Sequence, residues 1–322
     1  MNRPILCFGE ALIDFHAEGS SEGGFPRAYV PFAGGAPANV AVAVARLGGD
    51  ARFAGMLSTD PFGDFLLDSL RRTGVGVDDV MRTDEANTAL AFVSLDARGE
   101  RSFNFYRPPS ADLLFRPQHF RAGAFDDVAV FHVCSNSMTD PELAQTTREG
   151  MRRAQAAGAL VSFDLNLRPA LWPRESNPRP SVWPALHLAD VVKLCAEEFA
   201  WLTEDGDLLD RLWQGRTRLL VVTDGPRPLR WFARDARGEL PCPRVEAVDT
   251  TAAGDAFVGG LLCRLAALGH ADAFAALLHD QTALHDMLAF AAACGALTVT
   301  RQGSFTAMPS AREVHAFLES NR

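Results

Sequence analysis

Two aspartates flank a run of small residues in the stretch DTTAAGDAF, at positions 249–257. Small residues let a ligand approach the backbone closely, and the apolar residues Phe257, Leu261 and Leu265 recur at helical spacing. We therefore predict that a helix begins here, with N–H groups that lack intrahelical partners and a dipole that favours negative charge. A phosphate group could be held at such a helix end, beside Asp255. The alternative reading of Asp255 is a helix cap without a catalytic role.

The composition of the chain excludes some classes of function. Its 322 residues can bury a large core, either as one α/β domain or as a domain with a small appendage. Hydrophobic residues make up 48% of the chain, and the formal net charge is −9 at pH 7. This acidic balance opposes a general nucleic-acid-binding role but leaves room for a local anion site.

Cysteine spacing and apolar runs bear on the compartment. The six cysteines form no CxxC pair and no zinc-like spacing with histidines, which indicates reduced thiols in a cytoplasm. The N-terminal apolar segment is interrupted by Glu10 and Asp14 and lacks a basic lead, and no later run is long enough to span a bilayer. We expect a cytoplasmic protein that is not attached to a membrane.

Short β-rich runs alternate with longer helical patterns along most of the chain. This alternation predicts βαβ units and a parallel sheet. The runs read PILCFG, ARFAGML, VAVFHV, ALVSFDLN, ADVVKL and RLLVVT, and residues 141–157 are typical of the intervening helices. The run NVAVAVARLGG is ambiguous, because its period of two favours a buried strand while its alanine content and closing glycines favour a helix.

Two segments depart from this alternation of strands and helices. Residues 15–32 and 87–107 have the pattern of strands and turns, with the turn DARGE inside the second segment. We predict that they form a small antiparallel flap. A third segment, LWPRESNPRPSVWP at positions 171–184, is rich in proline and polar residues and is predicted to be a surface loop.

Four motifs in a fixed order resemble those of the ribokinase-like sugar kinases, also called the PfkB family. They are GEALIDF, AGGAPANVAVAVARLGG, TAAGDAFVGG and ACGALTVTRQG. The resemblance covers nearly the whole chain and implies a single domain of residues 1–322. It implies a ribokinase-like three-layer α/β fold with a mostly parallel central sheet and a small β-sheet lid, formed by residues 15–32 and 87–107.

The resemblance assigns catalytic roles around the predicted phosphate site. A sugar hydroxyl is a poor nucleophile near its ordinary pKa, so transfer needs a positioned base and dipoles around the γ-phosphate of ATP. Asp255 corresponds to the catalytic base of the family. The N–H groups of Ala252, Ala253, Gly254 and Asp255 would form an anion hole. The family most often has glycine at position 252, and the alanine methyl restricts φ and crowds the phosphate slightly.

The resemblance assigns sugar binding to Asp14, Gly35 and Asn39, because several hydroxyls need matching polar groups. Asp14 taken alone reads equally well as a carboxylate at a strand end in solvent. Arg107 resembles an arginine of fructokinases that reaches the sugar from below the lid, and its alternative is a surface arginine. The alternate phenylalanines of the run SFNFY either line the pocket or fasten the flap to the core, and we interpret them as core packing.

The nucleotide side also has candidate residues by resemblance. They are Asp164 and Glu198 for magnesium, the latter through water, Asn166, Arg168, Thr223 and Gly225 for ATP, and Asp249 and Thr251 for potassium. The alternative for Arg168 is a surface ion pair. Cys195 stands where the family has an asparagine, which puts the usual role of that position in doubt, and Ala292 makes the expected adenine contacts more apolar.

The sequence is therefore interpreted as that of an ATP-dependent sugar kinase that binds a small sugar and no nucleic acid. The resemblance implies transfer to the 6-hydroxyl of fructose, with ATP and Mg²⁺ as cofactors and potassium dependence open. The sequence leaves the oligomeric state open, although exposed lid strands offer an edge through which a homodimer could form. Arg107 and the AAGD form of the second signature keep a 2-keto-3-deoxygluconate kinase as the alternative. A different class of function is a catalytically silent protein that senses sugar or nucleotide.

Overall fold

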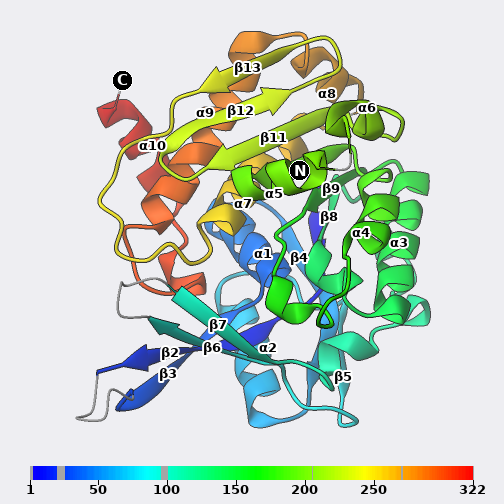
Figure 1. Cartoon of the computed structure of the whole chain (residues 1–322), viewed down its shortest axis with the longest axis vertical. Coiled ribbons are helices and arrows are strands. Elements are labelled where there is room, and N and C mark those ends of the chain that lie inside the picture. The colour runs from blue at the N-terminus through cyan, green and yellow to red at the C-terminus, as the bar shows by residue number, and fades with distance from the viewer. Residues whose placement is uncertain (1–2, 20–25, 96–100, 205, 270, 322) are drawn as a thin grey trace.

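A sheet of nine strands forms the centre of the computed structural model, which describes residues 3–19, 26–95, 101–204, 206–269 and 271–321 (Figure 1). The strand order is β13-β12-β11-β10-β9-β8-β1-β4-β5. Neighbouring pairs from β5 to β11 are parallel, as predicted, and β12 and β13 add antiparallel pairs at one edge. The strands are β1 (Ile5–Phe8), β4 (Ala51–Ser58), β5 (Val80–Thr83), β8 (Val130–Cys134), β9 (Leu160–Asp164), β10 (Val191–Cys195), β11 (Leu219–Asp224), β12 (Arg227–Phe232) and β13 (Arg237–Leu240).

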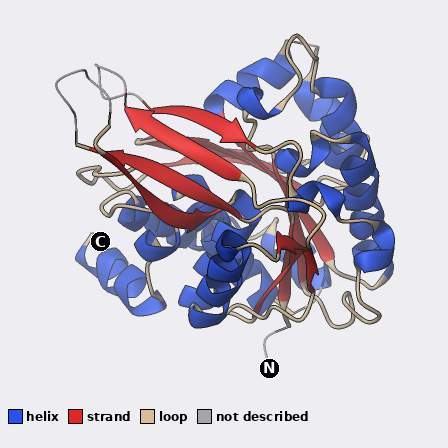
Figure 2. Ribbon diagram, turned by 90° about the horizontal axis from the view of Figure 1, so that it is seen from below, coloured by secondary structure: helices blue, strands red, loops and turns tan. Residues whose placement is uncertain are grey.

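Helices cover both faces of this sheet, which gives three layers (Figure 2). Side chains alternate along β1, because Ile5 and Cys7 pack in one hydrophobic cluster and Leu6 and Phe8 pack in the other. Strands buried on both faces are predominantly apolar, which is why their runs were recognisable in the sequence. One face carries α1 (Ala36–Arg46), α2 (Pro61–Arg72), α7 (Ala253–Ala267), α8 (Ala271–Leu277), α9 (Gln281–Thr298) and α10 (Ala311–Ser320), and the other carries α3 (Pro141–Ala156), α4 (Arg179–Leu186), α5 (Ala196–Thr203) and α6 (Leu208–Trp213).

A second, smaller sheet projects from the body (Figures 1 and 2). Its order is β3-β2-β6-β7, built from β2 (Leu12–Glu18), β3 (Ala28–Gly34), β6 (Leu90–Leu95) and β7 (Arg101–Tyr106). The prediction of an antiparallel flap was wrong in one respect, since β2 and β6 pair in parallel and only the outer pairs are antiparallel. Each predicted segment forms its own antiparallel pair, and the two pairs meet side by side. The predicted turn at residues 96–100 lies outside the described residues.

The ambiguous valine–alanine run forms helix α1. Its residues from Pro37 to Val44 are all buried, because α1 is packed between the sheet and α7. A helix buried on every side shows no amphipathic period. The two helices approach closely at Gly259, where a Cβ atom would lie 2.5 Å from the Cβ of Ala43.

The predicted surface loop at residues 171–184 is only partly a loop. Its second half belongs to α4, where Val182 and Trp183 are buried in the cluster under the sheet. Proline is tolerated in the first turn of a helix, so Pro180 did not exclude one. Short 3₁₀ turns are η1 (Ala111–Leu114), η2 (Pro117–His119), η3 (Ser135–Met138), η4 (Pro169–Leu171) and η5 (Phe305–Ala307).

Two further expectations concern cysteines and membranes. All six cysteines lie in the described chain and are free thiols. Over the residues that the structure describes, none of the helices has the length and apolar character needed to cross a bilayer.

Candidate active site

A cavity of about 850 Å³ opens at the carboxyl ends of the parallel strands. Strands β1 and β8 are neighbours, yet the chain leads from β1 toward β4 on one side and from β8 toward β9 on the other. Ligands of open α/β sheets bind at such a reversal of strand order. The cavity gathers most of the predicted site residues, namely Asp14, Gly35, Asn39, Asp164, Asn166, Arg168, Glu198, Thr223, Thr251, Ala252, Ala253, Gly254 and Asp255.

The amino end of α7 forms one wall of the cavity. The first intrahelical bond runs from Ala256 N to Ala252 O at 2.8 Å, so the N–H groups of Ala253, Gly254 and Asp255 precede it at the helix end. Ala252 has φ 59° and ψ 9°, in the left-handed region that favours glycine. The helix begins where the sequence predicted it, and its first N–H groups and its dipole favour negative charge at this wall of the cavity. The binding of a phosphate by these residues stays a prediction.

Two amides hold the carboxylate of Asp255. Asn39 Nδ2 donates to Asp255 Oδ2 at 2.7 Å, and Asn166 Nδ2 donates to Asp255 Oδ1 at 3.4 Å. Burial raises the pKa of Asp255, while the hydrogen bond from Asn39 and the nearby charges of Arg168 and Lys193 oppose that rise. A buried, oriented carboxylate with a raised pKa is suited to accept a proton near neutral pH.

Asp14 lies across the cavity, on lid strand β2. Its side chain is 7% exposed, and burial together with the charge of Asp255 raises its pKa to about 7. Two glycines make room for it and for the turn into α1. A Cβ atom on Gly34 would lie 2.1 Å from Asp14 Oδ2, and one on Gly35, whose φ is 106°, would lie 2.6 Å from Glu10 O. Position 35 therefore needs a glycine, because of its positive φ and its close approach to the Glu10 backbone, and this glycine also lines the cavity.

Lys193 is a site residue that sequence reasoning missed. It is buried in β10, lines the cavity, and places Nζ 3.2 Å from each carboxylate oxygen of Asp164. Burial alone would lower the pKa of Lys193, but Asp164 and Glu198 outweigh it and raise the pKa. A Cβ atom on Gly254 would lie 3.2 Å from Nζ, so the ammonium group borders the anion site. The available signal was a lysine inside the apolar run VVKLC.

Asp164 is the strongest candidate for a magnesium ligand. Among the described residues, no group of three or more histidine, cysteine and carboxylate side chains could hold a metal ion. Mg²⁺ in nucleotide sites uses one or two carboxylates together with substrate phosphates, so a single carboxylate beside the anion site fits this ion. Burial and the charges of Glu198 and Asp255 raise the pKa of Asp164, and Lys193 opposes them.

Glu198 holds two backbone segments together. Its Oε1 accepts from Leu167 N at 2.6 Å and its Oε2 accepts from Cys195 N at 2.7 Å, which ties the loop after β9 to the start of α5. The water-mediated magnesium role of Glu198 stays a prediction. Cys195 contacts Glu198 through its backbone N–H, which every residue except proline provides. The replacement of the family's asparagine by cysteine therefore leaves this hydrogen bond intact.

Three predicted residues do not appear among the described residues that line the cavity. Arg107 is 2% exposed and forms an ion pair with Asp112 beneath the lid. Gly225 lies in the turn between β11 and β12, with φ 55°. Asp249 accepts from Thr251 N at 2.7 Å and from Gly303 N at 3.1 Å, so it joins the anion loop to the C-terminal motif. The predicted binding roles of these residues stay predictions.

The phenylalanines of β7 were interpreted as core packing. Phe105 packs against the small cluster of Leu12, Ala89 and Ala91, as predicted, and it also lines the cavity. The side chain of Phe103 lies outside the described residues.

Comparisons with known proteins agree with this geometry. The family profile described as "pfkB family carbohydrate kinase" matches residues 2–311. Fructokinase-1 of Oryza sativa subsp. japonica is 42% identical over 98% of this chain and 98% of its own.

Solved structures are similar over the same extent. The fructokinase with bound ATP from Xylella fastidiosa has a TM-score of 0.95 and 55% identity, covering 100% of this chain and 99% of that chain. The fructokinase from Vibrio cholerae O395 in its fructose, ADP and calcium ion bound form has a TM-score of 0.88 and 33% identity, over 98% and 99% of the two chains.

Proposed function

This chain belongs to the pfkB family of carbohydrate kinases, and from that premise we propose that it transfers the γ-phosphoryl group of ATP to fructose. The observation that carries the proposal is the carboxylate of Asp255, held by Asn39 at the amino end of α7, inside a cavity at the switch point of the sheet. The similarity to fructokinases over almost the whole chain supports fructose as the acceptor.

The residues of the cavity divide the work of phosphoryl transfer. Asp255 accepts the proton of the 6-hydroxyl as the oxygen forms its bond to the γ-phosphorus, and the bond from that phosphorus to the bridging oxygen breaks to release ADP. The N–H groups at the start of α7 and the ammonium group of Lys193 stabilise the charge on the transferring group. Asp14 and Asn39 orient the sugar.

ATP and a metal ion serve as cofactors. We assign Mg²⁺ to Asp164 and the phosphates, where the ion would neutralise charge on ATP. A double mutant of the similar Vibrio cholerae fructokinase has been solved in a potassium ion bound form, which supports the loop of Asp249 and Thr251 as a potassium site here. Thr223 and the exposed Val248, which both line the cavity, suit the adenosine part of ATP. The predicted apolar adenine contact near Ala292 stays a prediction.

The substrate alternative finds little support in Arg107. A carboxylate substrate such as 2-keto-3-deoxygluconate would need a free guanidinium group in the cavity. The guanidinium of Arg107 is instead paired with Asp112, through Nε to Oδ2 at 2.8 Å, and bonded to the backbone of Asn136 at 2.7 Å. A neutral sugar fits this environment better.

The smaller sheet is proposed to act as a lid and as a contact between two copies of the chain. Its inner face carries Asp14 and Phe105, so closure over bound sugar would exclude water from the transfer step. Saturating fructose should then slow hydrogen exchange in β2, β3, β6 and β7, and unchanged exchange would reject the lid. The outer face is aromatic and exposed, which suits a homodimer. The cytoplasmic location stays a prediction.

A coupled ADP-release assay tests the proposed function. With Mg²⁺ and ATP saturating, kcat/KM for fructose should exceed the values for ribose and for 2-keto-3-deoxygluconate, and sugar-dependent ADP release would reject the silent sensor.

Asp255→Asn should lower kcat by about 10²–10⁴-fold while ATP still binds, because an amide cannot accept the proton. Asp68→Asn, on the exposed face of α2, is the matched control. Turnover by Asp255→Asn within a few-fold of the unaltered protein would remove Asp255 from the base role.

A further inference from the structure

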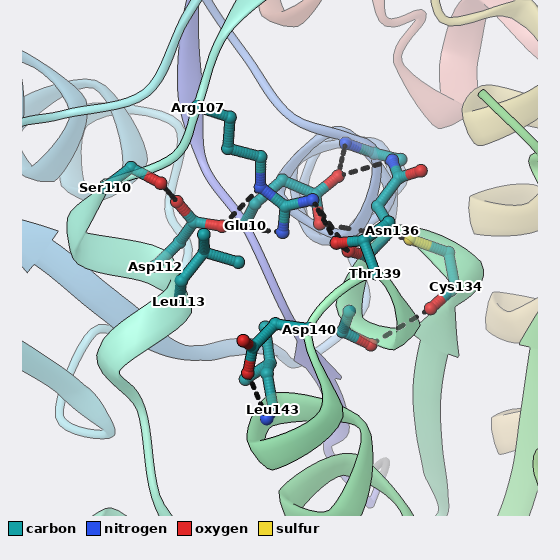
Figure 3. A network of polar contacts seen from close by, with 12 residues as sticks. Glu10, Arg107, Ser110, Asp112, Leu113, Cys134, Asn136, Thr139, Asp140 and Leu143 are labelled. Atoms are coloured by element: carbon teal, nitrogen blue, oxygen red, sulfur yellow. Dashed lines mark hydrogen bonds and ion pairs between the residues drawn. The ribbon is translucent and has the colours of Figure 1, made fainter. Parts of the chain in front are cut away.

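Glu10 and Asn136 belong to the cavity but have no part in the site described so far. Glu10 follows the carboxyl end of β1 and Asn136 follows that of β8, the two strands at the switch point. Both side chains line the cavity, and they are 1% and 5% exposed. Figure 3 shows them side by side, next to Arg107. Their position places two buried polar groups on the sugar side of the site.

The orientation of the Asn136 amide is fixed by Glu10. Asn136 Nδ2 donates to Glu10 Oε1 at 2.8 Å, and the same oxygen accepts from Ala36 N at 3.2 Å (Figure 3). An oxygen that accepts from two N–H donors selects the nitrogen end of the amide and turns the other end away. The amide oxygen of Asn136 is therefore the end that remains for another partner.

Arg107 fixes the backbone that carries Asn136. Its Nη1 donates to Asn136 O at 2.7 Å and to Thr139 Oγ1 at 3.0 Å, while Nε bonds to Asp112 Oδ2 at 2.8 Å (Figure 3). Ser110 Oγ holds the second oxygen of Asp112 at 2.6 Å. Burial raises the pKa of Glu10, and the charge of Arg107 and the hydrogen bond from Asn136 oppose that rise. Because Glu10 Oε1 accepts from Ala36 N, this oxygen acts as an acceptor toward Asn136 in either protonation state.

The amide oxygen of Asn136 is buried and has no hydrogen-bond partner among the described residues. The amide oxygen of Asn39, which also lines the cavity, is likewise buried without a hydrogen-bond partner among the described residues. A buried acceptor without a donor costs free energy, and such groups persist where a ligand supplies the donor. A sugar hydroxyl is a donor of the right kind, and each sugar brings several.

We propose that Asn136 is a sugar-binding, specificity-determining residue whose Oδ1 accepts a hydrogen bond from one ring hydroxyl. Glu10 and Arg107 are positioning residues, because they set the amide orientation and the backbone of Asn136 without donating to that hydroxyl themselves. This inference rests on the proposed function, since it needs a sugar as the occupant of the cavity.

Steady-state kinetics of Asn136→Leu tests the inference. Leucine has a similar volume but no acceptor, so KM for fructose should rise at least about tenfold, with KM for ATP unchanged and kcat changed less than about threefold. Ser137→Ala, in the same 3₁₀ turn, is the matched control and should keep the kinetics of the unaltered protein, because among the described residues its hydroxyl bonds to Cys134 O alone. An unchanged KM for fructose in folded Asn136→Leu overturns the proposal. A parallel change in both KM values with a lowered melting temperature also overturns it, because that is the pattern of a structural role.

Monodeoxy analogues of fructose identify the hydroxyl. The unaltered protein should discriminate against one analogue at least about tenfold, and Asn136→Leu should lose that discrimination because the acceptor is gone. Equal discrimination by both proteins would overturn the assignment of Oδ1. If the unaltered protein phosphorylates another sugar and not fructose, the proposed function fails, and the same comparison on that sugar still decides the role of Asn136.

Glu10→Leu tests the positioning role, after thermal melting has established that the variant is folded. Leucine offers no acceptor to Asn136 Nδ2, so the amide loses the preference for its nitrogen end, which should raise KM for fructose more than it changes kcat. In an Asn136→Leu background the same substitution should have no further effect on KM, because both changes act through one hydrogen bond. Additive effects on KM would show that Glu10 acts independently of Asn136 and would overturn its positioning role.

Discussion

At the scale of single residues, Lys193 brings a positive charge to the end of α7 where the helix already attracts anions. Lys193→Met should lower kcat by roughly 10²–10³-fold, because a fixed charge beside the transferring group is lost. Steady-state kinetics with fructose and ATP measure this. The substitution also leaves the buried Asp164 unpaired, so circular dichroism and thermal melting must first establish that the variant is folded. A folded variant with kcat within twofold of the unaltered protein would exclude Lys193 from catalysis.

The buried carboxyl group of Asp14 lowers the stability of the folded protein at neutral pH. Its folded-state pKa of about 7 lies above the ordinary value, so the folded protein binds the extra proton between about pH 4 and pH 7. This carboxyl group therefore reduces stability as the pH rises through that window. Asp14→Asn does not titrate, so its free energy of unfolding should exceed that of the unaltered protein by roughly 1–4 kcal/mol at pH 8, and by less at pH 5.

Urea unfolding of both proteins at pH 5 and pH 8 gives this difference, and sugar binding should be lost in the same variant. Other buried carboxyl groups titrate in both proteins. The effect of Asp14 is therefore given by the difference in the free energy of unfolding between the two proteins at each pH. A difference that does not change between the two pH values would contradict a raised pKa for Asp14.

The sequence predicted those site residues that belong to a recognisable motif, and it missed those whose partners lie on other strands. Asp255 and Asn39 were predicted because each sits in a motif. The roles proposed for Lys193, Glu10 and Asn136 depend on partners from neighbouring strands. No local pattern records that β1 and β8, or β9 and β10, lie side by side. Glu10 was visible in the first motif without a role, since its partner is 126 positions away.

At the scale of elements, the first turn of α7 contains stored backbone strain. Ala252 occupies the left-handed region, which costs an alanine roughly 1–2 kcal/mol relative to glycine, and glycine gives back part of this through the unfolded chain. Ala252→Gly should therefore raise the free energy of unfolding by about 0.5–1 kcal/mol and keep kcat within about twofold. Ala267→Gly, exposed at the other end of the same helix, is the control and should destabilise by about 0.5–1 kcal/mol. Destabilisation by Ala252→Gly would show that the alanine methyl is needed for packing.

Elements were predictable where one physical requirement dominated. The sheet strands had to be apolar on both faces, and six of them stood out as apolar runs. The period of the sequence did not identify helix α1, because this helix is buried on all sides. Prolines concealed α4, since Pro180 lies in its first turn, where proline is tolerated, and Pro184 lies inside the helix. The parallel contact between β2 and β6 follows from how the two lid segments meet in space, which no local pattern contains.

At the scale of the whole molecule, the smaller sheet has two faces with different chemistry. Residues alternate along its strands, so Asp14 points into the cavity while Phe15 lies on the opposite face, half-buried against Phe62 of α2. On the outer face Phe92 lies at the centre, with ring centroids of Phe15 and Tyr29 5.1 Å away and that of Tyr106 5.4 Å away. The local sequence pattern predicted the strands of this sheet. Which residues share a face follows from how the four strands pair, and the sequence pattern does not contain that register.

An aromatic face that remains in water predicts a homodimer through the lid. Tyr106 is 63% exposed and Tyr29 is 39% exposed, and a contiguous apolar patch of this kind marks an interaction surface. The unaltered protein should sediment at twice its monomer mass of 34.9 kDa. Tyr106→Asp places a charge in the aromatic patch beside Phe92, so the dissociation constant of the dimer should rise at least about tenfold. Gln214→Asp adds the same charge after α6, at the opposite end of the molecule (Figure 1), and should leave the dimer intact. Analytical ultracentrifugation over a concentration series measures all three proteins. A monomeric unaltered protein, or a Tyr106→Asp dimer of unchanged affinity, would reject the lid as the contact, and a second copy would then have to bind elsewhere or not at all.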